Sequence, residues 1–196
     1  MSEFDKRAIA LSFRKFKDYS TDVLGSNSAT FDTRLKIFID HCENDPIMAV
    51  ISSQLKKIES GFDTWWEKAL QSRGSFIGSA TFDLPTDENL RDSLLYDICS
   101  RLNSRQIRLD SFSLAFFTST RFDDMVSDFN DSIFRPLTRS LEYKFDTIDF
   151  KIEDEYSQTN KIPETVLIVY TDNRVLIKDS TFEGDAVVGK SATLDK

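Results

Sequence analysis

Arg34 and His41 are the two residues whose types and spacing come closest to a catalytic pair. The chain contains one histidine, so acid–base chemistry that depends on an imidazole near neutral pH must use His41. The two residues are seven positions apart on a helix predicted for residues 30–43, which places them on one face beside its apolar stripe. The alternative is a surface arginine and a partly buried, hydrogen-bonded histidine without a catalytic role.

The spacing of Arg34 and His41 resembles the R-x4-6-H signature of HEPN-type ribonucleases. These are all-helical proteins common in toxin and defence systems, in which arginine and histidine from two subunits converge on the scissile phosphate. The resemblance implies an RNA substrate and a catalytic role for both residues. A ribonuclease is therefore the alternative function that we retain for this chain.

A second chemical motif lies near the C-terminus. Residues 184–191 read GDAVVGKS and fit the phosphate-binding pattern GxxxxGK[ST], in which Gly184, Gly189, Lys190 and Ser191 would hold a nucleotide. Such a loop needs a strand before it and a helix after it, so that backbone amides point at the phosphates. Residues 192–196 are too few for that helix. We therefore expect no nucleotide cofactor.

Three aspartates, Asp124, Asp128 and Asp131, share one face of a long predicted helix and could hold a hard cation. No matching set of glutamates or histidines appears elsewhere in the sequence. A run of acids also usually forms a solvated helix face. We therefore expect no metal ion.

The helices that carry these residues are predicted from apolar residues three or four positions apart. The longest and most regular stripe covers residues 122–150 and keeps its phase across Pro136, which predicts one Pro-kinked helix. Further helices are predicted at residues 3–24, 30–43, 46–58, 62–70, 87–102 and 107–118.

Capping residues and a loop separate these helices. Asp45 followed by Pro46 predicts a side-chain cap and a first-turn proline. Thr120 and Asp123 predict a capping box at the start of the long helix. Residues 73–86 are rich in glycine and serine, so an irregular loop is expected there.

The C-terminal part of the chain changes from a helical to an alternating pattern. Residues 166–170 and 174–178 flank Asp172 and Asn173, a pair typical of a hairpin turn. Large apolar residues also recur every six positions, which resembles the hexapeptide repeat of left-handed β-helices and would allow a single coil over residues 176–196. Hairpin and coil both remain open. The apolar residues that we expect to make contacts are Val166, Ile168, Val175, Leu176, Ile177, Phe182, Val188 and Leu194.

Composition and charge narrow the function classes. The chain has 196 residues, 17 of them phenylalanine and only 10 glycine or proline, as expected of a folded helical protein with one substantial core. Its net charge of −8 argues against wholesale wrapping by nucleic acid or an anionic membrane. The isolated Cys42 and Cys99 fit buried thiols in a reducing compartment. With no signal peptide and no apolar run of bilayer length, we expect a cytoplasmic protein without membrane contact.

These observations predict a mainly α protein with three parts. Residues 1–150 form a bundle of about seven helices, residues 151–165 an acidic linker, and residues 166–196 a small β tail. Because so short a tail cannot bury its own aliphatic residues, we expect it to dock on another copy, as a homo-oligomer, or on a partner protein. The leading function is a non-catalytic protein–protein interaction or oligomerisation module without cofactors. We expect a nucleic-acid partner only under the ribonuclease alternative.

Overall fold

The structure is a computed structural model, and it describes residues 2–4, 6–74, 77–78, 80–145, 166–171 and 174–179. The chain divides into two units. The first, which we call the helical unit, consists of residues 9–146, and the second consists of residues 1–8 together with residues 147–196.

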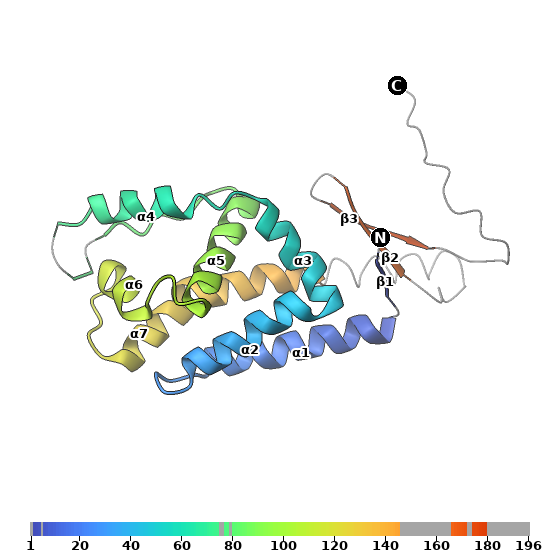
Figure 1. Cartoon of the computed structure of the whole chain (residues 1–196), viewed down its shortest axis with the longest axis horizontal. Helices are drawn as coiled ribbons and strands as arrows, with labels where there is room; N and C mark the ends of the chain where they lie inside the picture. The colour runs from blue at the N-terminus through green and yellow to red at the C-terminus, as the bar shows by residue number, and fades with distance from the viewer. Residues whose placement is uncertain are drawn as a thin grey trace, which may run out of the picture. The chain divides into compact units, whose positions relative to one another are not determined.

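The described part of the chain is mainly helical, as predicted (Figure 1). Its helices are α1 (Lys6–Leu24), α2 (Phe31–Asn44), α3 (Pro46–Lys57), α4 (Phe62–Gln71), α5 (Glu88–Asn103), α6 (Leu109–Phe116) and α7 (Phe122–Phe129), followed by the π-helical turn η1 (Asn130–Phe134) and a helical segment at residues 135–145. Helix α5 packs against α2, α3, α4 and η1. It therefore connects most of the bundle.

Phenylalanines form much of the core, and Phe16, Phe38 and Phe145 come from the predicted apolar stripes. Phe16 of α1 packs on Phe38 of α2 with ring centroids 5.7 Å apart, and Phe38 packs on Phe134 of η1 at 4.8 Å. Phe145 closes the cluster, 5.8 Å from Phe16. All four side chains are buried. Each contributes about 1.5–3 kcal/mol of hydrophobic stabilisation, which is why the stripe was a reliable predictor of the fold.

The predicted side-chain cap of α3 is present. The Oδ1 atom of Asp45 accepts hydrogen bonds from the backbone N–H groups of Ile47, at 3.0 Å, and Met48, at 3.1 Å, so Asp45 caps α3 as expected. The capping box predicted from Thr120 and Asp123 was wrong. The N-cap position of α7 belongs to Arg121, which makes no side-chain cap hydrogen bond.

Asp123 instead ties α7 to the loop between α1 and α2. Its Oδ1 accepts a hydrogen bond from the backbone N–H of Ser28 at 2.8 Å. Hydrogen bonding by Ser28, through its side chain first and its backbone N–H second, lowers the pKa of Asp123 below its ordinary value. The described hydrogen bond of this carboxylate is therefore a long-range one and not the predicted local one.

The long predicted helix crosses Pro136 by changing its hydrogen bonds. Pro136 has no N–H to donate, and its ring would clash with the preceding turn of an α-helix. Just before it, the N–H of Arg135 donates to the carbonyl of Asn130, five residues earlier, which is the wider turn of a π-helix. Asn130 also donates through Nδ2 to the carbonyl of Val23 at 3.0 Å and so holds this turn against α1. The helix continues to residue 145, and residues 146–150 lie outside the described part.

The loop between α4 and α5 packs on the last turn of α6. The N–H of Gly78 donates to the carbonyl of Leu114 at 2.9 Å, and the N–H of Ala80 donates to that of Ala115 at 3.0 Å. Carbonyls at a helix C-terminus have no partner within their own helix, so the loop satisfies them. Gly78 has a φ of +61°, and a Cβ placed on it would lie 2.7 Å from the backbone of Phe117. Only glycine fits this position.

The second unit contains three described strands, β1 (Ser2–Phe4), β2 (Val166–Thr171) and β3 (Arg174–Asp179). They form an antiparallel sheet in the order β1-β2-β3. The helix predicted from residue 3 begins instead at Lys6, because Ser2–Phe4 pairs with β2. Most of the alternative coil predicted for residues 176–196 lies outside the described residues.

Candidate functional site

Five of the predicted interaction residues lie on paired strands. Val166 and Ile168 belong to β2, and Val175, Leu176 and Ile177 belong to β3. The register places Ile168 opposite Ile177. Outside the described residues lie the other interaction candidates, Phe182, Val188 and Leu194, and the nucleotide-binding candidates, Gly184, Gly189, Lys190 and Ser191.

Arg34 is bound to the C-terminal end of α1. Its Nη1 donates hydrogen bonds to the backbone carbonyls of Asp22, at 2.8 Å, and Gly25, at 3.0 Å. Carbonyls at this end of a helix lack helical partners and carry the negative end of the helix dipole, so a guanidinium stabilises them. Arg34 therefore fastens α2 to α1 in this structure.

His41 packs between α1 and the start of α3. Its side chain is only 7% exposed, its Nε2 lies 3.3 Å from the carbonyl oxygen of Ser12, and its ring meets that of Tyr19 at a centroid distance of 5.2 Å. Burial lowers the pKa of His41 below its ordinary 6.5, although the carboxylate of Asp45, 4.0 Å from Nδ1, opposes that effect. The structure thus places Arg34 and His41 two turns apart on α2, with each in contact with α1.

A buried polar cluster joins α5 to the helical segment 135–145, and the sequence did not lead us to it. The carboxylate of Asp92, 1% exposed, accepts hydrogen bonds through Oδ2 from the Ser140 hydroxyl and the Lys144 ammonium. Lys144 also lies 3.2 Å from the Ser140 Oγ. The sequence signal was the four-residue spacing of Ser140 and Lys144, which puts both on one helix face. Ser140 and Lys144 thus both bind the same carboxylate of α5. The cluster therefore locks two helices together.

Two adjoining pockets form a groove between α2 and the C-terminal end of α5. Their volumes are about 470 Å³ and about 340 Å³, and both have Asp32, Leu102 and Arg105 in their walls. We call them together the α2–α5 groove. Its other lining residues are Ser28, Phe31, Thr33, Leu35, Lys36, Asn103, Ile107, Arg108, Leu109, Asp110 and Phe122. The groove combines charged and apolar groups, as ligand sites do.

Arg105 is the unusual residue of this groove. It follows the end of α5 with a φ of +59°, the left-handed conformation that glycine normally supplies at this position. Its N–H donates to the carbonyl of Leu102 at 3.0 Å, and the next N–H, that of Gln106, donates to Arg101 at 2.9 Å. In the part of the chain that the structure describes, the Arg105 guanidinium forms no hydrogen bond or ion pair. The sequence signal that we missed was the absence of a glycine after α5.

None of the protein families, curated proteins or solved structures compared with this chain matches it. Among the described residues, no helix is long and apolar enough to cross a membrane. The same residues contain no group of three or more histidine, cysteine or acidic side chains placed to hold a metal ion. The functional argument therefore rests on the geometry given above.

Proposed function

We propose that this protein is a non-catalytic interaction or oligomerisation module, in which the helical unit is the rigid body and the β tail is the docking element. The observation that carries this proposal is the strand order β1-β2-β3, in which β3 pairs with β2 on one side only among the described strands. An edge strand presents unpaired N–H and C=O groups. A strand from another chain can add to that edge through backbone hydrogen bonds.

The composition of β2 and β3 supports the same proposal. Opposite residues in an antiparallel pair share a face, so the register groups Ile168 with Ile177 and Tyr170 with Val175. Val166 joins them by the two-residue alternation of a strand. β2 and β3 have only six residues each and β1 has three, so apolar side chains on this small sheet gain most from burial against another surface. Docking on another copy or on a partner protein supplies that surface.

The ribonuclease alternative stays a prediction, and no described contact favours it. Arg34 donates to the end of α1, and His41 is buried against Ser12 and Tyr19. Incubation with total RNA tests it directly. Cleavage that is abolished by His41→Ala would support a ribonuclease, whereas an inert wild-type protein would exclude it.

The interaction proposal is tested by light scattering of the full chain and of a truncation after Asp154, which lacks β2 and β3. The full chain should give a multiple of its 22.5 kDa mass, and the truncation should be a folded monomer by circular dichroism. If both are monomers, the homo-oligomer is excluded. Docking on a different protein would then be supported by a purified partner that binds the full chain and does not bind the truncation.

A further inference from the structure

We propose that the α2–α5 groove binds an acidic peptide segment that carries an aromatic or aliphatic side chain, with Arg105 and Phe122 as the principal contacts. This site lies entirely on the helical unit. It is separate from the strand edge proposed above, so the protein would have two independent docking surfaces.

The backbone of Arg105 is the first step of the argument. A non-glycine residue in the left-handed region is strained, and glycine adopts the same φ without that cost. The fold alone would therefore favour glycine after α5. Compensation of the helix dipole does not explain the arginine, because Arg101 already occupies the last turn of α5. What arginine adds at position 105 is a cationic side chain on a residue that lines both pockets of the groove.

The charges of the groove are the second step. Arg108 and Asp110 form two hydrogen bonds with each other, at 3.0 Å and 2.5 Å, so these two charges cancel. Among the lining residues, the remaining charges are those of Asp32, Lys36 and Arg105, one positive charge in excess. The nearby carboxylate of Asp123 is engaged by Ser28. A guanidinium without a partner is well suited to a carboxylate, which it can bind through two parallel hydrogen bonds.

The apolar surface is the third step. Phe122 at the start of α7 is 60% exposed, and the walls beside it include Phe31, Ile107 and Leu109. An exposed aromatic ring next to an arginine is typical of the anchor positions of protein interfaces. The two pockets share Asp32, Leu102 and Arg105 in their walls. Such a groove fits several residues of an extended peptide, with an apolar side chain on Phe122 and a carboxylate at Arg105.

Fluorescence anisotropy with the full-length protein tests this proposal. The probe is a fluorescein-labelled decapeptide in which aspartate alternates with phenylalanine, and the comparison peptide has lysine in place of aspartate. The acidic peptide should bind more tightly than the basic one, and its affinity should fall as salt is added. No preference for the acidic peptide would overturn the proposal.

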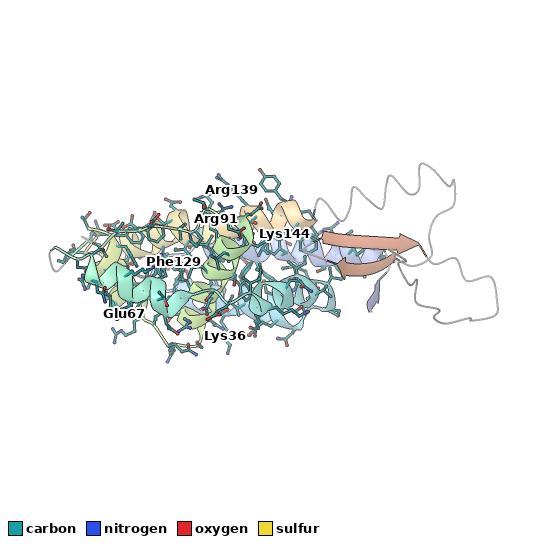
Figure 2. All side chains as sticks on the ribbon, turned by 90° about the horizontal axis from the view of Figure 1, so that it is seen from above. Lys36, Glu67, Arg91, Phe129, Arg139 and Lys144 are labelled. Carbon is teal, nitrogen blue, oxygen red and sulfur yellow. The ribbon has the colours of Figure 1, made fainter. Side chains whose placement is uncertain are left out.

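Three variants locate the binding. Arg105→Gly should weaken binding of the acidic peptide by roughly ten- to hundredfold while the unfolding temperature stays close to that of the wild type, because glycine suits the backbone there. Phe122→Ala should also weaken it. The control is Arg139→Ala, since Figure 2 shows Arg139 and the groove residue Lys36 at opposite edges of the helical unit. Wild-type affinity in Arg105→Gly would contradict the groove proposal. The strand-edge proposal is tested separately, by light scattering of the tail truncation.

Discussion

Lys144 donates a hydrogen bond to the buried carboxylate of Asp92, which lies 52 positions earlier in the chain. The ion pair therefore fastens the last described helical segment to α5. Lys144→Met should lower the free energy of unfolding by about 2–4 kcal/mol, because it leaves a buried carboxylate without its counter-charge. Adding Asp92→Asn should recover part of the loss. Urea denaturation measures both effects, and a loss no larger than that of the exposed control Arg139→Met would contradict this role.

His41 should make the stability of the protein depend on pH. Burial lowers the pKa of His41 below its ordinary 6.5. The unfolded chain therefore binds a proton at a higher pH than the folded protein, and stability should fall as the pH drops below about 6.5. His41→Gln removes this titration, so its urea midpoint should change less than that of the wild type between about pH 7.5 and about pH 5.5. Equal changes in both proteins would show that His41 does not contribute.

Three glycines should respond differently to alanine. Gly78→Ala should cost about 2–4 kcal/mol, because φ is +61° and the new Cβ would lie 2.7 Å from the Phe117 backbone. Gly61 has a φ of +68° but no atom within 4 Å, so Gly61→Ala should cost about 1 kcal/mol. Gly74, with neither constraint, should tolerate alanine. Thermal unfolding of the three variants gives the order, and a Gly78→Ala variant as stable as Gly74→Ala would refute the close packing of this loop on α6.

The two cysteines should be inert in the folded protein. Cys42 and Cys99 are fully buried, and burial raises the pKa of both thiols, so little reactive thiolate is present. Ellman's reagent should react with both only after denaturation. Rapid reaction under native conditions would mean that the core around α2 and α5 opens readily.

Local patterns predicted the helices, whereas contacts between distant residues account for most of what was missed. The cap of α3 by Asp45 depends on residues only two and three positions later, and sequence spacing describes such bonds well. The Ser28 N–H that binds Asp123 is 95 positions away. A local sequence pattern cannot reveal a contact between residues so far apart. Asp123 was therefore assigned to a capping box at the start of α7 that does not form.

The candidate site was harder to predict than the fold. Arg34 and His41 share a helix face, as expected, but the spacing could not show that both would contact α1. The α2–α5 groove depends on how α2, α5, α6 and α7 pack against one another. The spacing of apolar residues along each helix does not define that packing. The one sequence signal for this groove was Arg105, a charged residue at a position where a helix commonly ends with glycine.

The central claim is that another chain adds to the edge of β3 that no described strand covers. Hydrogen–deuterium exchange of the backbone amides of residues 174–179 tests it most directly. Measured in dilute monomer and in the assembled protein, the amides of this segment that point away from β2 should gain protection on assembly, because a new strand accepts hydrogen bonds from them. If assembly occurs while the amides of β3 exchange at the monomer rate, the strand edge is not the docking surface.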